Sequence, residues 1–169
     1  MIEPAIALTA AGLACRPVSA SDLELICQQR EAMFLEAGKD AQALRLMTEH
    51  FRPWLAPRLR DGRYYGFIAL AGAEPVAGIG LMNLEWPPHP SHPTMGERGY
   101  VLNVYVNPSH RRRGLAAGLV QLAEAEFTRR GLQFAVLHAT AAGQPVYAQA
   151  GWAGTSEMAK RLDAGAMPR

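Results

Sequence analysis

The sequence predicts a single α/β domain of the α+β type, in which helices flank a mixed central sheet. The chain has 169 residues, 49% of them hydrophobic and 19% charged, which suffices for one compact domain with a substantial core. Apolar residues first recur at helical spacing, then fall into short strand-like runs, and finally alternate between helix and strand. That order favours a mixed sheet with helices packed on it.

The N-terminal part is predicted to contain one strand and two helices. A strand over residues 13–18 precedes capping side chains and a helix whose apolar stripe stops near Gly38. A second helix is expected over residues 40–50. Pro53 and Pro57 are expected to disrupt its far end, because proline removes a backbone donor and its ring clashes with the preceding turn.

The middle of the chain is predicted to form strands, because the apolar residues lose their helical spacing there. Residues 65–70 and 76–82 are apolar runs separated by a short turn segment, and we expect them to form a hairpin. Residues 86–93 contain four prolines, which lack a backbone donor, so we expect a stiff loop. Residues 99–106, rich in β-branched and aromatic side chains, are expected to form another strand.

The C-terminal part is predicted to alternate helix, strand and helix. An amphipathic helix is expected from Gly114 to a stop at Gly131, followed by a strand over residues 133–139 and a short helix over residues 145–150. The functional signal lies where the strand over residues 99–106 turns into the first of these helices.

The charge balance excludes a surface built as a whole to bind nucleic acid or anionic lipid. The chain carries 17 Lys and Arg against 15 Asp and Glu, a formal net charge of +2. Only Lys39 and Lys160 are lysines, so nearly all the positive charge is arginine, which holds carboxylate and phosphate oxygens in bidentate fashion. Any anion site should therefore be local.

The cysteines and the apolar runs predict a cytoplasmic protein without a metal centre. Cys15 and Cys27 are the only cysteines, and no Cys or His stands near either at metal-ligand spacing. The apolar stretch 5–15 follows Glu3 without a basic segment, so we expect it to belong to the mature protein rather than to a signal peptide. No run approaches the roughly 18 to 20 apolar residues of a membrane span.

The segment 104–116, VYVNPSHRRRGLA, combines a strand end, a turn and a helix start. A helix N-terminus presents unpaired N–H groups and about half a positive charge, so arginines and a glycine in its approach predict a phosphate site. Gly114 lets the backbone come close to a ligand, and the small Ala116 keeps the next turn clear. The glycine patterns of nucleoside-triphosphate and dinucleotide loops are absent.

The remaining pattern is Arg-x-x-Gly-x-Ala after the strand end Val106-Asn107-Pro108. It resembles the GNAT superfamily of N-acetyltransferases, whose acetyl-CoA signature is Arg/Gln-x-x-Gly-x-Gly/Ala at this turn. A second segment, residues 138–152, is similar to the family's closing strand, helix and Tyr-x-x-x-Gly-Phe element, with Trp152 in place of the phenylalanine. Thr140 stands where many members carry Asn, and the motif-specific similarity begins at about Val101.

The resemblance implies one GNAT domain over residues 1–169, with a mostly antiparallel central sheet and helices on both faces. Residues 1–95, approximately, would shape the substrate site, and residues 96–155 would bind acetyl-CoA. Acetyl-CoA would enter a wedge where the strands over residues 101–106 and 133–139 separate. The implied reaction is acetyl transfer to the primary amine of a small molecule or peptide by direct attack, with no metal and no covalent enzyme intermediate.

The resemblance also assigns residues to acetyl-CoA. Backbone groups at the strand end would pair with the pantetheine arm, and the amide near Val104 would polarise the thioester carbonyl. Backbone N–H groups of the turn would hold the pyrophosphate, with arginine side chains beside it. The implied cofactor-binding residues are Val104, Tyr105, Val106, Arg111, Arg112, Arg113, Gly114, Leu115, Ala116, Thr140 and Tyr147.

Two catalytic roles are expected from the same resemblance. Tyr147 would donate a proton to the departing thiolate, which suits a phenol whose ordinary pKa is about 10. The amine must also lose a proton, and as its base we rank Glu97, just before the central strand, above Glu85, just after the preceding strand. Three histidines are further candidates for the base, because imidazole groups commonly exchange protons near neutral pH, but their positions in the sequence suit the role less well than those of the glutamates: His89, His92 and His138.

Other interpretations stay open. Tyr147 also fits an ordinary core tyrosine, and Glu85 and Glu97 fit solvated loop carboxylates. In that case the chain would be a catalytically idle acyl-CoA-binding module. The run 110–113 also fits a solvated helix entry or a contact to nucleic acid, which the near-neutral charge disfavours. The sequence does not select the acceptor amine, and it leaves a homodimer open.

Overall fold

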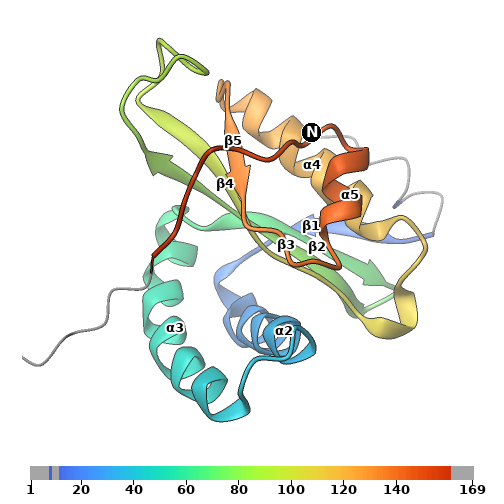
Figure 1. The fold of residues 1–169 in the computed structure, drawn as a ribbon. Helices are drawn as coiled ribbons and strands as arrows, with labels where there is room; N and C mark the ends of the chain where they lie inside the picture. Colours follow the sequence, from blue (N-terminus) through green and yellow to red (C-terminus); the bar gives the residue numbers. More distant parts are fainter. Residues whose placement is uncertain (1–7, 9–11, 161–169) are drawn as a thin grey trace, which may run out of the picture.

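One mixed sheet forms the centre of the molecule (Figure 1). The computed structural model describes Leu8 and residues 12–160, so much of the apolar stretch 5–15 lies outside the described residues. The strands follow one another in the order β1-β2-β3-β4-β5, antiparallel except that β5 runs parallel to β4. The mostly antiparallel sheet expected from the sequence is therefore confirmed. The strands are β1 (Ala14–Pro17), β2 (Tyr65–Ala71), β3 (Glu74–Glu85), β4 (Glu97–Val106) and β5 (Ala135–Leu137).

Helices cover both faces of this sheet. The pair α2 and α3 lies on one face, and α4 lies on the other with α5 beside it (Figure 1). Two short 3-10 helices, η1 and η2, come just before α2 and α4. The helices are η1 (Ala20–Asp22), α2 (Leu23–Glu36), α3 (Ala41–Asp61), η2 (Pro108–His110), α4 (Leu115–Arg129) and α5 (Gln144–Gln149).

The helix α3 continues without a break through both of its prolines, so the predicted disruption at Pro53 and Pro57 is wrong. Pro53 is exposed and Pro57 is only partly buried, so both rings lie off the face that packs on the protein. The buried face continues past them, and its burial outweighs the lost backbone hydrogen bonds. That face is formed by Leu44, Thr48, Phe51, Leu55 and Leu59.

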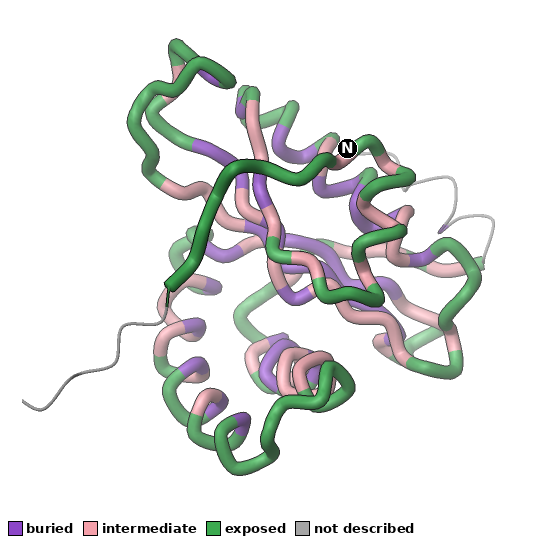
Figure 2. The backbone as a smooth tube through the Cα atoms, in the orientation of Figure 1, coloured by how far each residue is buried: buried purple, intermediate pink, exposed green. Residues whose placement is uncertain are grey.

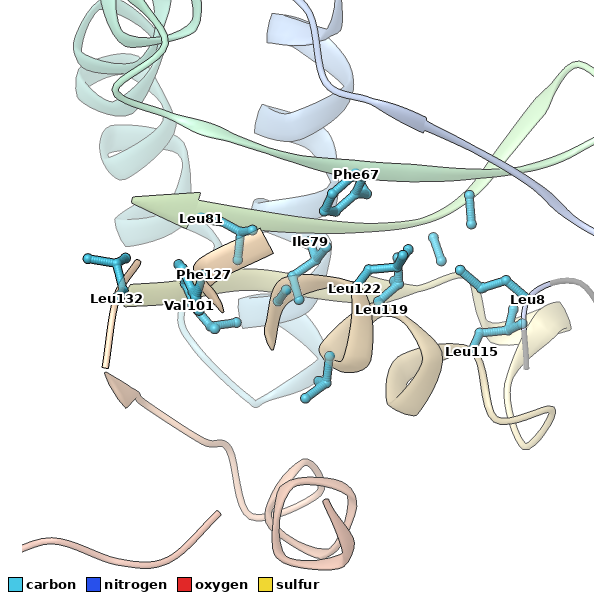
Figure 3. Packing of buried hydrophobic residues seen from close by; sticks show 14 residues of the cluster. Leu8, Phe67, Ile79, Leu81, Val101, Leu115, Leu119, Leu122, Phe127 and Leu132 are labelled. Atoms are coloured by element: carbon cyan, nitrogen blue, oxygen red, sulfur yellow. The ribbon is translucent and has the colours of Figure 1, made fainter. Parts of the chain in front are cut away.

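Two apolar clusters fill the space on either side of the sheet. The first lies between the sheet and α4, where Phe67, Leu81, Val101 and Leu119 pack together (Figure 3). Figure 2 shows buried backbone along the sheet and on the inward sides of α2, α3 and α4. The second cluster lies under α2 and α3 and contains Ile26, Cys27, Phe51, Leu55, Leu59 and Tyr64.

The strand β4 separates from β5 part-way along its length. Pairing between the two strands covers only Gly99 to Val101 on β4, so the predicted wedge is confirmed. Just beyond, β4 has one extra residue relative to β3, because Gly78 pairs with Tyr105 while Gly80 pairs with Leu102. The bulge residue Asn103 has a φ of 54°, and it turns its side chain under α2.

Candidate functional site

The C-terminal half of β4 presents an unpaired edge. Among the described residues, no strand pairs with β4 beyond Val101 on the side of β5. Val104, Tyr105 and Val106 lie on this stretch, and the side chains of Val104 and Val106 pack against the cluster below α4. The side chains of these two valines are therefore directed to the core, while the backbone groups of this strand edge are left without a strand partner.

The turn after β4 exposes backbone donors at the start of α4. Arg112 has a φ of 60° and Gly114 a φ of 75°, and alternating left-handed residues of this kind make successive N–H groups converge. Gly114 is the N-cap of α4 and supplies no capping side chain. Leu115 is 2% exposed, so only its N–H group is available to a ligand, while Ala116 is partly exposed.

The three arginines of the turn have different surroundings. Nε of Arg111 donates to the carbonyl oxygen of Val106 at 2.9 Å, and its guanidinium forms an ion pair with Glu36, the last residue of α2. The Arg111 side chain therefore holds the strand end against α2 and does not stand free for a phosphate. Arg112 and Arg113 are exposed and have no ion pair among the described residues. Because Arg111 is paired with Glu36, the basic run 110–113 also offers one arginine fewer for a contact to nucleic acid.

The helix α5 places Tyr147 beside the first apolar cluster. Its ring meets Trp152 edge-on, with 6.4 Å between the ring centroids, and packs against the Gly143 backbone. Burial alone raises the pKa of the Tyr147 hydroxyl above its ordinary value of 10.0. Thr140 does not present its side chain freely, because its hydroxyl accepts a hydrogen bond from the N–H of Gly143 at 3.2 Å. It thus shapes the turn that leads into α5.

A cavity lies between β5, α5 and the segment that follows α5. His138 and Tyr147 both line it, and Glu157 closes its other side. The segment that follows α5 crosses β5 in the view of Figure 1, and an ion pair at 3.7 Å from Glu157 to Arg98 brings it to the start of β4. The cavity is thus on the α5 side of β5, next to the wedge rather than inside it.

The two glutamates proposed as bases lie away from the wedge. Glu85 and Glu97 pair directly across β3 and β4, and both are exposed. Glu97 accepts a hydrogen bond from Nδ2 of Asn83 at 2.9 Å. Glu97 lies six positions before the bulge residue Asn103, roughly 20 Å along a strand. This placement argues against Glu85 and Glu97 as the base.

Comparison with known proteins identifies the family. Residues 25–152 match the model of the acetyltransferase (GNAT) family, a segment that contains both the turn before α4 and Tyr147. This chain belongs to the GNAT acetyltransferase family. The crystal structure of a GCN5-related N-acetyltransferase from Ralstonia eutropha JMP134 is similar over 89% of this chain and 99% of that chain, with 58% sequence identity and a TM-score of 0.88. No curated protein matches the chain significantly.

More distant structures share the GNAT fold. A predicted acetyltransferase from Clostridium acetobutylicum, crystallised with acetyl-CoA, is similar over 89% of this chain and 96% of that chain, with 23% identity and a TM-score of 0.77. The ribosomal-protein-alanine N-acetyltransferase from Brucella melitensis biovar Abortus 2308 is similar over 90% of this chain and 99% of that chain, with 19% identity and a TM-score of 0.64. At these identities the likeness concerns the fold alone.

This GNAT acetyltransferase has a tyrosine and histidine pair where its strands separate. Sequence reasoning ranked His138 low and missed Tyr100. The Tyr100 hydroxyl lies 2.7 Å from Nδ1 of His138. Tyr100 pairs with Val136 inside the short β4–β5 ladder, and His138 follows directly after its end. Burial raises the pKa of Tyr100. The sequence signal that could have indicated this pair is the position of His138 directly after the strand that borders the wedge.

Within Leu8 and residues 12–160, no helix is both long and apolar enough to cross a membrane. In the same part of the chain, no three or more His, Cys, Asp or Glu side chains are grouped as ligands of a metal ion.

Proposed function

We propose that this GNAT acetyltransferase transfers the acetyl group of acetyl-CoA to a primary amine by direct attack. The observation that carries the proposal is the unpaired edge of β4, Leu102–Val106, followed in the chain by the uncapped N-terminus of α4. A pantetheine arm contains amide groups that pair with such an edge, and a pyrophosphate suits a helix N-terminus with free N–H groups. Acetyl-CoA carries both the pantetheine arm and the pyrophosphate, so it requires the strand edge and the helix N-terminus to lie next to each other.

The proposed reaction is a single acyl transfer. The nitrogen lone pair of the amine attacks the thioester carbon, the C–N bond forms, and the C–S bond breaks. The backbone amide at Val104 stabilises the developing oxyanion. The thiolate takes the proton of the Tyr147 hydroxyl, and the Tyr147 phenolate regains a proton from solvent, so the products are an N-acetyl amide and free CoA. Because burial raises the pKa of Tyr147, the hydroxyl keeps its proton through the neutral range.

The amine proton needs an acceptor near the wedge, and the Tyr100–His138 pair takes that role in place of Glu97 and Glu85. The Tyr100 oxygen accepts the amine proton as its own proton passes to Nδ1 of His138, along the 2.7 Å contact. The His138 imidazole then returns this proton to solvent.

The first test is isothermal titration of acetyl-CoA into the protein, with Arg113→Ala and Gly114→Asp as variants. Wild-type binding that weakens with Arg113→Ala and disappears with Gly114→Asp supports the site, since any side chain at a φ of 75° strains the turn and a carboxylate repels phosphate. Release of free thiol with a panel of amines then tests transfer. Binding without thiol release would indicate an idle acyl-CoA-binding module, and no binding by the folded wild type would overturn the proposal.

We also propose a reducing, cytoplasmic location. It is supported by the two cysteines, because Cys15 and Cys27 are both free thiols. Burial raises the pKa of Cys15 to about 11, which keeps this thiol protonated and poorly reactive. Western blotting of cell fractions would test the location.

A further inference from the structure

The guanidinium of Arg30 lies against the bulge of β4 and lacks most of its partners. Its Nη1 donates to Oδ1 of Asn103, the bulge residue. Its carbon Cζ lies over the rings of Phe34 and Phe51, 4.9 and 4.6 Å from their centroids. Its Nε is buried and has no hydrogen-bond partner among the described residues. The side chain as a whole keeps part of its surface exposed.

No carboxylate neutralises this cation within the described part of the chain. Every ion pair found there belongs to another arginine. Glu31, the next residue in α2, accepts a hydrogen bond from Thr48 at 2.6 Å instead. Burial lowers the pKa of Arg30, as expected for a cation removed from water without an anion. Arginine keeps its charge at neutral pH all the same, so the cation stays uncompensated, which is costly in a folded protein.

A second arginine adds positive charge to the same face of β4. Arg98 is 7% exposed and stacks on Trp86 at 3.5 Å, and its Nε also has no partner among the described residues. Its carboxylate partner is Glu157, at 3.7 Å. Tyr100 lies between Arg98 and the bulge, so the two guanidiniums flank the residue proposed to take the amine proton. Because Glu157 is the counter-ion of Arg98, the uncompensated positive charge on this face is that of Arg30, and it favours an anionic ligand.

We infer that Arg30 binds an anionic group, a carboxylate or a phosphate, on the acceptor and so presents the amine at the β4 bulge. The inference rests on the proposed acetyl transfer at Val104, the residue after Asn103. A guanidinium binds such a group through charge-assisted hydrogen bonds, and Nη2, which has no hydrogen bond among the described residues and is not buried as Nε is, supplies one. Acceptors of this class are amino acids and other small amines that carry an acidic group. Polycationic amines are repelled.

The test measures free thiol release with pairs of amines that differ only in the anion. Leucine and leucinamide form the carboxylate pair, phosphoethanolamine and ethanolamine the phosphate pair, and spermidine is the polycation. The proteins are the wild type, Arg30→Gln, Arg30→Lys and Arg58→Gln. Arg58 is the matched control, a partly buried arginine that lies over Trp54 at 4.1 Å and has no ion pair among the described residues. Urea unfolding and acetyl-CoA titration of each variant separate lost folding from lost selectivity.

We expect wild-type kcat/KM to favour the anionic member of at least one pair by about tenfold or more, the worth of a charge-assisted hydrogen bond. Which pair shows the preference identifies carboxylate or phosphate. Arg30→Gln should abolish the preference, Arg30→Lys should keep part of it, and Arg58→Gln should leave it unchanged. Comparing variants on the same two amines cancels their intrinsic difference in basicity.

Two results would overturn the inference alone. One is thiol release without any preference for the anionic amines. The other is an Arg30→Gln variant that slows both members of a pair equally, because a purely structural arginine would act that way. Absence of thiol release with every amine would instead overturn the proposed acetyl transfer, and the inference with it.

Discussion

Replacing Tyr64 by Phe should destabilise the fold by about 2 kcal/mol, because it leaves a buried hydrogen-bond donor without a partner. Tyr64 is 2% exposed, and its hydroxyl accepts a hydrogen bond from Nδ2 of Asn103 at 3.0 Å. Asn103 is 6% exposed, so water cannot easily replace the lost acceptor. The ring stays packed in the variant, so the cost is that of an unpaired buried amide, about 1 to 3 kcal/mol.

Urea unfolding at neutral pH measures this loss, as a lower midpoint with an unchanged slope. Tyr65→Phe is the matched control, because it removes the same atom from the next residue. The Tyr65 hydroxyl donates to Asn83 at 2.5 Å in a partly exposed setting, so its loss should cost no more than about 1 kcal/mol. Equal losses in the two variants would refute the argument that burial of Asn103 sets the cost.

The stability difference between wild type and Tyr64→Phe should also depend on pH in the alkaline range. Burial raises the pKa of Tyr64 well above its ordinary value of 10.0. The stability linked to this shift is complete below pH 10 and is lost as the pH rises toward the folded value, by about 1.4 kcal/mol per pH unit. Phenylalanine has no such dependence. The difference in unfolding free energy between wild type and Tyr64→Phe should therefore narrow above pH 10.

Three further predictions concern other parts of the molecule. In a thiol-release assay, Tyr147→Phe should lower kcat by about a hundredfold, while acetyl-CoA binding stays intact. Because the pKa of Tyr147 is raised, the wild-type rate should not fall on the alkaline side below pH 10. Asp22→Asn should lose about 1 to 3 kcal/mol at neutral pH. Hydrogen bonding to Arg16 holds the pKa of Asp22 below 3.8, so this deficit should vanish in thermal unfolding as the pH falls below that value. Gly66→Ala should cost about 3 kcal/mol or more in urea unfolding, because its Cβ would overlap the carbonyl oxygen of Ile79, whereas Gly72→Ala, in open space, should cost about 1 kcal/mol.

The fold was predictable where local pattern and tertiary contact agree. The apolar alternation of β4 and the apolar stripe of α4 indicate both elements and also match the faces that they bury. The course of α3 was not predictable, because Pro53 and Pro57 oppose the helix locally while the buried stripe around them favours it. Which of the two prevails depends on the surface against which the helix packs, and the sequence of α3 does not contain that surface.

In the candidate site too, local features could be predicted from the sequence and long-range contacts could not. The turn before α4 is a local feature, so Gly114 and the exposed Arg112 could be placed from a short motif. The ion pair between Arg111 and Glu36 joins residues 75 positions apart, and no periodicity reports such a contact. The bulge at Asn103 changes which side chains of β4 face α2. Neither this bulge nor the contact between Tyr100 and His138, 38 positions apart, can be read from positions along one strand.

The helix α2 connects the two halves of the proposed site. From its middle, Arg30 reaches the bulge residue Asn103, next to the proposed position of the acetyl group. From its last residue, Glu36 holds Arg111 at the start of the turn proposed to bind pyrophosphate. A shift of α2 along its axis would therefore disturb both contacts together, because a helix moves as a rigid element. If an anionic acceptor binds Arg30, it should for this reason also restrain the turn, and acetyl-CoA and the acceptor should each strengthen binding of the other by the same factor.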